Sequence, residues 1–135
     1  KECLVELGGE LFAMGRWTVG VEDPSRQGAM IRELVLENEA LATSGLYRAR
    51  RNIGGKMVSH ILSPFTGKPI EDTAEIVSVR AVTCLEAKGW VNALIASGTQ
   101  KIPVLVSQHG LDAIWMTSEG VVFEVSRKSG LSDVK

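Results

Sequence analysis

"EIVSVRAVTCLEAKGWVNALIASG" (residues 75–98) contains the strongest structural signals in this chain. Residues 75–83 are rich in β-branched side chains, which suit a pleated surface and predict a central strand. Thr83 and Glu86 form a capping box, in which each side chain satisfies a backbone N–H at the start of a helix. We therefore expect a helix from about Cys84 to Ser97, ended by the glycine that follows.

The expected helix carries two different faces. Its apolar side chains recur three or four positions apart, a spacing typical of a helix that packs on a core. This buried stripe comprises Cys84, Ala87, Val91 and Leu94. Lys88 and Asn92 lie four residues apart and therefore share a different face.

Short apolar runs separated by glycines predict strands in the first third of the chain. Residues 3–22 contain three such runs, punctuated by Gly15 and Gly20, and we expect a meander of short strands. An Asp-Pro pair beginning at Asp23 predicts the loop that follows. The run "AMIRELVLEN" (residues 29–38) fits both helical and strand spacing, and we favour a strand.

Two hairpins and a short helix are expected further along. Apolar runs flank Gly54 and Gly55, and a glycine pair readily supplies the positive φ of a two-residue hairpin turn. Residues 101–110 predict a short helix with Pro103 in its first turn, where a proline is tolerated. Residues 111–126 predict a closing hairpin that turns at a Glu-Gly pair.

Together these elements predict an α+β fold, a largely antiparallel sheet with one long and one short helix packed on it. The chain has 135 residues, of which 44% are hydrophobic, enough for one compact domain with a substantial core. We expect a single domain over residues 1–127 and a flexible tail over residues 128–135.

Charge and composition argue against several classes of partner. The net charge is −1 and the basic residues are scattered, which argues against nucleic acid as the main partner. No apolar run approaches the roughly 20 residues needed to span a bilayer, and no targeting segment opens the chain, so we expect a soluble protein of unspecified compartment. Cys3 and Cys84 have neither metal-site spacing nor the density of a disulfide scaffold.

Three segments rich in small residues are candidates for contact with a ligand. They are "ELGGE" (residues 6–10), "ATSG" (residues 42–45) and "SHILSPFTG" (residues 59–67). We interpret each as a turn at a strand end, where exposed backbone amides can bind an anion. None has the glycine spacing of a Walker or dinucleotide loop. His60 is either a hydrogen-bonded imidazole at a strand end or part of a functional site.

Five segments, taken in order, resemble consecutive motifs in the C-terminal half of the ApbE family, the FAD:protein FMN transferases. They are "LVELGGELFAMG", "WTVGVEDP", "ALATSGLY", "GGKMVSHILSPFTGKPI" and "VRAVTCLEAKGWVNALIASG". The resemblance covers about residues 4–98. It implies an enzyme that cleaves FAD at its pyrophosphate and attaches FMN through a phosphoester to a threonine of an acceptor protein, with magnesium on the phosphates.

The resemblance also implies which residues approach the flavin nucleotide. The cofactor-binding candidates are Gly8, Gly9, Thr43, Ser44, Gly45, His60, Thr66, Gly67 and Lys88. His60 is the candidate catalytic residue, as a general base for the acceptor threonine.

The sequence departs from the family pattern where the metal is expected. The family carries an Asp and, four residues later, a Thr that help to hold magnesium, and Lys88 and Asn92 stand at these positions. Two further family acids are replaced by Leu46 and Ser63. An ammonium cannot ligate Mg²⁺, so we expect the usual metal site to be lost. Either Lys88 supplies its own positive charge to the pyrophosphate, or it points into solvent.

The family's catalytic unit is longer than this chain. We therefore expect either a missing N-terminal half or a homo-oligomer to complete the site. Two alternatives to an active transferase remain open, namely a flavin- or nucleotide-binding module without catalysis and an oligomerisation domain.

Overall fold

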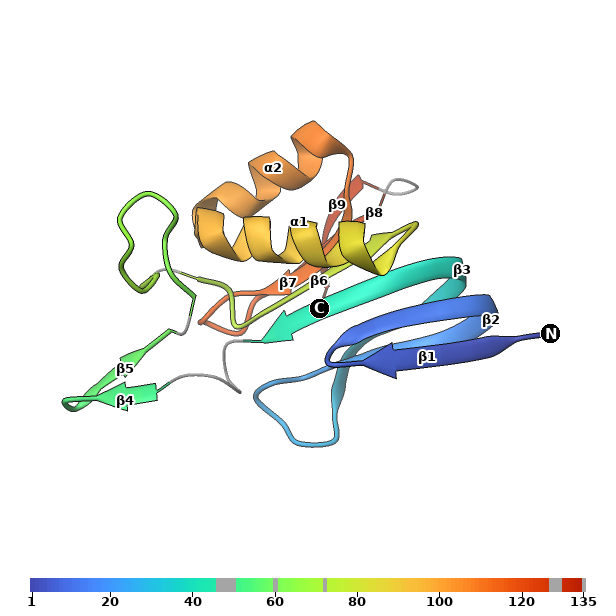
Figure 1. Ribbon diagram of the computed structural model, residues 1–135, viewed down its shortest axis with the longest axis horizontal. Helices are drawn as coiled ribbons and strands as arrows, with labels where there is room; N and C mark the ends of the chain where they lie inside the picture. Colours follow the sequence, from blue (N-terminus) through green and yellow to red (C-terminus); the bar gives the residue numbers. More distant parts are fainter. Residues whose placement is uncertain (46–50, 60, 72, 127–129, 135) are drawn as a thin grey trace.

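The strands of the chain form one large antiparallel sheet. The computed structural model describes residues 1–45, 51–59, 61–71, 73–126 and 130–134, and within them the main sheet has seven strands in the order β1-β2-β3-β6-β7-β8-β9. These strands are β1 (Cys3–Leu7), β2 (Glu10–Glu22), β3 (Met30–Gly45), β6 (Ile76–Ala81), β7 (Asp112–Met116), β8 (Val122–Ser126) and β9 (Gly130–Val134). The helices α1 (Cys84–Ser97) and α2 (Ile102–His109) lie together on one face of the sheet (Figure 1). The expected α+β fold is confirmed.

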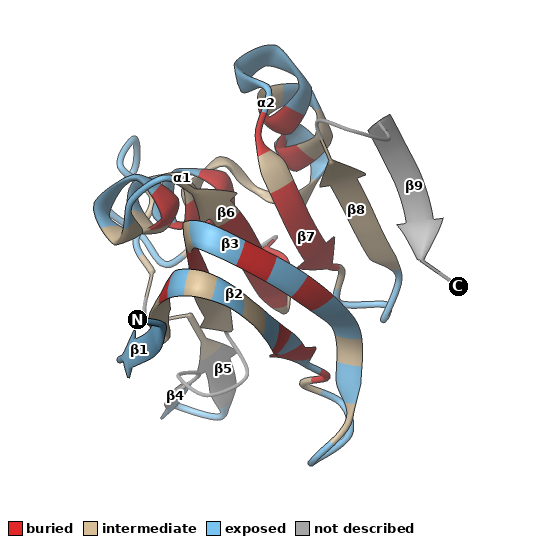
Figure 2. Ribbon diagram, turned by 90° about the vertical axis from the view of Figure 1, so that its right-hand side faces the viewer, coloured by how far each residue is buried: buried red, intermediate tan, exposed pale blue. Residues whose placement is uncertain are grey.

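The predicted central strand is β6, which lies between β3 and β7. Its first four residues are buried, as expected of a strand covered on both faces (Figure 2). Thr83 caps α1 as predicted, because its side-chain oxygen accepts a hydrogen bond from the backbone N–H of Glu86 at 3.2 Å. Strand β6, the Thr83 cap and helix α1 therefore follow one another as the local sequence predicts.

A first hydrophobic core lies between the sheet and the two helices. Ala87, Val91, Leu94 and Ile95 of α1 are buried against β3 and β6. The predicted stripe is correct except that Cys84 is only half-buried. A short 3₁₀ turn, η1 (Thr99–Lys101), leads into α2, whose Ile102 and Val106 extend the same core. No helix of the described residues is both long and apolar enough to cross a bilayer.

The strands β2 and β3 are long and bend away from the rest of the sheet. The meander of short strands expected over residues 3–22 is wrong beyond Leu7, because β2 continues without a break from Glu10 to Glu22. Gly15, which we expected to end a strand, instead lies in a β-bulge between Ala13 and Arg16, and the strand continues past it. At this bulge the N–H of Gly15, with φ +84°, donates to the side chain of Asn38 at 2.8 Å.

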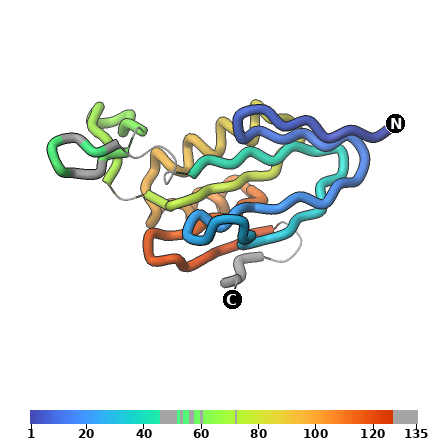
Figure 3. The backbone as a smooth tube through the Cα atoms, turned by 90° about the horizontal axis from the view of Figure 1, so that it is seen from below, coloured from blue at the N-terminus to red at the C-terminus, as the bar shows by residue number. Residues whose placement is uncertain are grey.

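The bent part of β2 and β3 builds a second core on the opposite face of the sheet. Its side chains pack against those of β6 and β7, and the buried members are Ala13, Val19, Val21, Leu34, Leu36, Leu41, Ile76, Ile114 and Met116. An ion pair of 2.9 Å between Arg32 and Glu124 joins the start of β3 to β8. In the view from below, the loop between β2 and β3 lies in front of the closing hairpin, on the side of the sheet opposite the helices (Figure 3).

The remaining hairpins agree with the sequence. The strands β4 (Arg51–Ile53) and β5 (Lys56–Val58) pair on either side of Gly54 and Gly55, which have φ of +60° and +86°. This hairpin forms a separate two-stranded sheet that extends from the main body (Figure 1). The predicted strand over residues 29–38 is confirmed as part of β3, and α2 and the hairpin β7–β8 are also confirmed.

The flexible tail expected over residues 128–135 is wrong for Gly130–Val134, which form strand β9 paired with β8. The register places Leu131 opposite Val125 and Val134 opposite Val122. Pairing also satisfies backbone groups of β8 that would otherwise lie at an open edge. The domain boundary at residue 127 stays a prediction.

A matched pair of leucines on α1 tests the first core. Leu94 is fully buried, whereas Leu85 is 86% exposed. We expect Leu94→Ala to lower the free energy of unfolding by about 2–5 kcal/mol because it removes buried methyl groups and leaves a cavity. Leu85→Ala should lower it by less than about 0.5 kcal/mol. Urea unfolding followed by circular dichroism measures both, and equal losses would contradict the placement of α1.

The loop between β2 and β3 makes stability depend on acid pH. Hydrogen bonds from the side chain and backbone N–H of Ser25, and then from Arg26, hold the pKa of Asp23 below its ordinary value of 3.8. The ionised carboxylate therefore stabilises the fold above pH 3.8, and this contribution is lost as the pH falls through the lower, folded pKa. Asp23→Asn should flatten the acid side of a plot of melting temperature against pH. Glu119→Gln, at an exposed turn, serves as the control.

Candidate functional site

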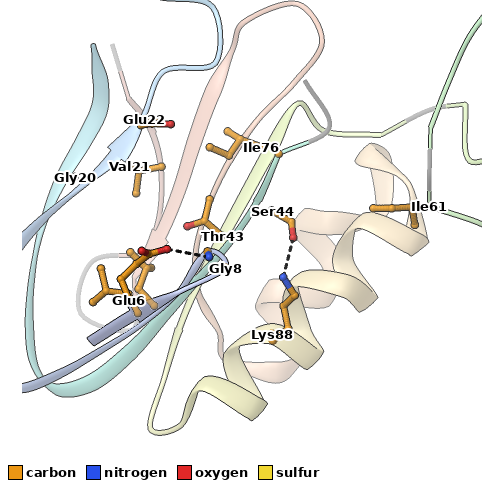
Figure 4. A pocket seen from close by; sticks show the side chains of 14 residues that line it. Glu6, Gly8, Gly20, Val21, Glu22, Thr43, Ser44, Ile61, Ile76 and Lys88 are labelled. Carbon is orange, nitrogen blue, oxygen red and sulfur yellow. Dashed lines mark hydrogen bonds between the residues drawn. The ribbon is translucent and has the colours of Figure 1, made fainter. Parts of the chain in front are cut away.

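A pocket of about 460 Å³ opens at the end of the main sheet, where the β1–β2 turn, the end of β3 and helix α1 meet (Figure 4). It is lined by Glu6, Gly8, Gly9, Leu11, Gly20, Val21, Glu22, Leu41, Thr43, Ser44, Gly45, Ile61, Ile76 and Lys88. Six of the nine ligand-binding residues predicted from the sequence are in this set, namely Gly8, Gly9, Thr43, Ser44, Gly45 and Lys88. Segments that are far apart in the sequence thus share one cavity.

The turn between β1 and β2 requires glycine. Gly8 and Gly9 have φ of +64° and +94°, a region that other residues rarely adopt. A Cβ on Gly9 would lie 2.9 Å from the backbone oxygen of Thr43. The turn is held by two hydrogen bonds, from Thr43 N–H to the Gly9 oxygen at 2.9 Å and from Gly9 N–H to Glu6 Oε1 at 3.1 Å. The absence of side chains lets the turn lie directly on the end of β3.

The "ATSG" segment is not a turn, as we had expected, but the last part of strand β3. It stays extended because residues 42–45 pair with β6, from Val79 to Ile76. Alternation along the strand sends neighbouring side chains to opposite faces. The Thr43 hydroxyl lies 2.9 Å from that of Ser78, whereas Ser44 Oγ accepts a hydrogen bond of 3.3 Å from Lys88 Nζ of α1.

Lys88 is the centre of a small charged cluster in the pocket. Its Nζ lies 2.5 Å from Oε1 of Glu10, and the two side chains are only 34% and 25% exposed. The ion pair therefore joins the start of β2 to the first half of α1. Of the described residues that line the pocket, Lys88 is the only basic one. The alternative that Lys88 points into solvent is wrong.

Glu10 was missed in the sequence, although it follows the predicted glycine turn directly. The half-buried ammonium of Lys88 needs an acidic or polar partner, but the sequence offers many carboxylates and no local pattern selects Glu10. Val21 and Ile76 were missed as pocket residues for the same kind of reason, since they reach the pocket through the bend of β2 and the pairing of β6.

Two predicted residues lie elsewhere, and a third falls outside the described residues. Thr66 lines a separate open hollow of about 540 Å³ beside the C-terminal end of α1, and Gly67 lies in the same exposed turn with φ +67°. Ile61, from the start of that segment, does reach the main pocket. His60 lies outside the described residues, so its role as a base stays a prediction.

Among the described residues there is no group of three or more His, Cys, Asp or Glu side chains that could hold a metal ion. Asn92 is exposed one turn of α1 beyond Lys88 and does not line the pocket. The positive charge beside Glu10 is the ammonium of Lys88.

Comparison with known proteins gives consistent matches. The sequence model of the ApbE family matches residues 1–115. This chain is 36% identical to the FAD:protein FMN transferase of Salmonella typhimurium and 34% identical to that of Escherichia coli K12. Each alignment spans 128 residues and covers 90% of this chain. These alignments cover 37% and 36% of the two relatives, so the chain spans little more than a third of their length.

Solved structures match in the same way. The ApbE protein of Thermotoga maritima superposes with a TM-score of 0.80 and 26% identity, over 94% of this chain and 43% of that one. The flavinyl transferase ApbE of Pseudomonas stutzeri, in its apo form, has a TM-score of 0.76 and 31% identity, over 98% of this chain and 40% of that one.

The glycine turn can be tested against a glycine that has room for a side chain. Gly9→Ala adds a clash with the Thr43 carbonyl to the strain of its positive φ, whereas Gly28, with φ +79°, has no atom within 4 Å of an added Cβ. We expect Gly28→Ala to cost roughly 1–2 kcal/mol of stability from strain alone, and Gly9→Ala to cost clearly more. Thermal unfolding checks this order, and equal losses would contradict the close approach of the turn to β3.

Proposed function

This chain belongs to the ApbE family, and from that membership we propose that it forms part of the FAD site of an FAD:protein FMN transferase. The observation that carries the proposal is the pocket, which gathers the "GG", "TSG" and Lys88 positions into one cavity. The relatives named FAD:protein FMN transferase align over 90% of the chain, which supports the same assignment. FAD is the substrate in this proposal, and a threonine of an acceptor protein receives FMN.

The pocket has features suited to the phosphate part of a dinucleotide. Gly8, Gly9 and Gly45 carry no side chain and so allow close approach of a ligand, and Ser44 and Lys88 supply a hydroxyl and a positive charge. Turn amides and a lysine are common groups around phosphate oxygens. The apolar wall of Leu11, Leu41 and Ile76 offers contact area beside these polar groups.

The proposed reaction is a substitution at phosphorus. The acceptor hydroxyl oxygen attacks the phosphorus of the FMN half, the P–O bond to the adenylate half breaks, and AMP leaves with the electron pair. The hydroxyl proton passes to a base, for which His60 is our candidate. Binding and orientation by the pocket would supply most of the rate enhancement, as is usual for phosphoryl transfer.

The family implies magnesium at the phosphates, but the described residues do not fit it. Lys88 occupies the position beside Glu10, and an ammonium excludes rather than ligates a hard dication. We therefore derive no step through a metal. The same observation favours a second candidate function, a flavin-binding module that holds FAD without transferring FMN.

The chain also leaves surface for a further polypeptide. All five residues of the edge strand β1 are exposed, including Val5 and Leu7. An open, apolar strand edge is suited to pairing with another segment. We propose that the remainder of the longer protein typical of the family, or a second copy of this chain, covers it.

Filling the pocket tests the proposed function. Ser44→Phe places a ring in the cavity and should abolish FAD binding, whereas Ser107→Phe, at an exposed site on α2, should leave FAD binding unchanged. Calorimetric titration gives the affinity, and melting temperatures verify that both variants fold. FMN transfer is followed as a mass increase of an acceptor peptide that contains threonine.

Binding with transfer supports the transferase, and binding without transfer supports the flavin-binding module. If folded Ser44→Phe protein binds FAD as tightly as the parent, the pocket is not the flavin site and the proposal is wrong.

A further inference from the structure

Lys88, Glu10 and Ser44 form a cluster in which the Lys88 ammonium can still donate to a ligand. An ammonium has three N–H donors. Lys88 donates one to Ser44 Oγ at 3.3 Å, and its Nζ forms an ion pair of 2.5 Å with Glu10 Oε1. Donor capacity is therefore left for a ligand in the cavity that Lys88 lines. Figure 4 shows this side chain reaching from α1 toward Ser44 at the pocket wall.

We infer that this pocket binds a diphosphate without any divalent cation, with Lys88 as the built-in positive charge. The inference rests on the proposed function only for the identity of the ligand, FAD. Lys88 contacts a phosphate oxygen directly, and Glu10 is a positioning residue that fixes the direction of the ammonium. Ser44 holds the same ammonium from the strand side.

The packing around Lys88 makes this arrangement stable. The side chain is about one-third exposed, so it is partly desolvated yet open to a ligand. Its partner Glu10 starts β2 directly after the glycine turn, and the hydrogen bond between Thr43 and Gly9 fixes that turn on β3. The ion pair and the hydrogen bond from Lys88 to Ser44 therefore link β2, α1 and β3 before any ligand arrives, which lowers the cost of ordering the site.

The same geometry disfavours a magnesium ion. Mg²⁺ requires near-octahedral oxygen ligands at about 2.1 Å and is repelled by an ammonium a few ångströms away. Glu10, the carboxylate nearest to Lys88, is already paired with it. Glu6, another carboxylate of the pocket, accepts the N–H of Gly9 and lies at the exposed rim. A magnesium ion that used Glu10 as a ligand would have to displace Lys88 from it.

The experiment is calorimetric titration of FAD and, separately, of inorganic pyrophosphate into the purified protein, in EDTA and in excess MgCl₂. We expect the Kd for each ligand to differ by less than about twofold between the two conditions. Lys88→Met should weaken binding in EDTA by about tenfold to a hundredfold, because a charge-assisted hydrogen bond is lost. Lys88→Arg should restore most of the affinity, and Lys101→Met, at an exposed lysine outside the pocket, should change nothing.

A companion variant guards against misfolding. Lys88→Met leaves Glu10 half-buried without its cation, so the double variant Lys88→Met with Glu10→Gln removes both charges and retains the packing. It should melt near the parent temperature and still bind pyrophosphate weakly. Parent-like affinity in this folded double variant would overturn the inference.

A further variant tests whether the site can be converted. Lys88→Asp places a carboxylate on α1 beside the carboxylate of Glu10. We expect this variant to bind FAD only when Mg²⁺ is present. FAD binding by this variant in EDTA as tight as that of the parent would overturn the role given to Lys88.

The outcomes of these titrations distinguish a failure of this inference from a failure of the proposed function. If FAD binds only with Mg²⁺, the inference is wrong and the proposed function stands. If pyrophosphate binds in EDTA through Lys88 but FAD does not bind, the inference stands and the proposed function fails. If neither ligand binds in EDTA to folded protein, the inference is overturned.

Discussion

The bulge at Gly15 and Asn38 is the constraint on which much of this structure depends. It lets β2 and β3 turn out of the plane of the sheet, so that β3 pairs with β6 only from Ala40 to Gly45. The earlier half of β3 instead packs under β6 and β7 and closes the second core. Gly20 and Val21, carried by the same bend, then form one wall of the pocket. A straight β2–β3 pair would leave one face of the central strands bare and the pocket without that wall.

Local signals in the sequence were sufficient where an element depends on its own residues. The central strand, the capped helix and the hairpin at Gly54 and Gly55 followed from β-branching, a Thr-x-x-Glu box and a glycine pair. The errors occurred where pairing partners decide. Gly15 looks like a strand end until Asn38 accepts its N–H, and "ATSG" looks like a turn until β6 pairs with it. Strand β9 needs β8 in the same way, because Gly130–Val134 has little intrinsic tendency to form a strand.

The candidate site was predictable in its members but not in its geometry. Six of the nine residues expected near the ligand do line one pocket, because the resemblance that suggested them preserves their order along a common fold. Thr66 lies in a different hollow, and the pairing of Lys88 with Glu10 had no counterpart in the sequence pattern. A contact between residues this far apart depends on how the β1–β2 turn lies against α1. Such contacts arise only from the packed fold, which is why the charge in the pocket had to be read from the structure.

The lysine in the pocket also limits which residues its position tolerates. A neutral residue at position 88 would leave Glu10 as an uncompensated, half-buried carboxylate, which is costly. A lysine instead neutralises Glu10 and keeps α1 tied to the β1–β2 turn. Lys88 therefore preserves the arrangement of the pocket wall, whereas alanine or asparagine at this position would leave Glu10 without its cation. Selection for a folded pocket alone would accept any neutral pair at these two positions. Lys88 instead keeps an ammonium that is 34% exposed at the wall of an open pocket, which a neutral pair would not supply.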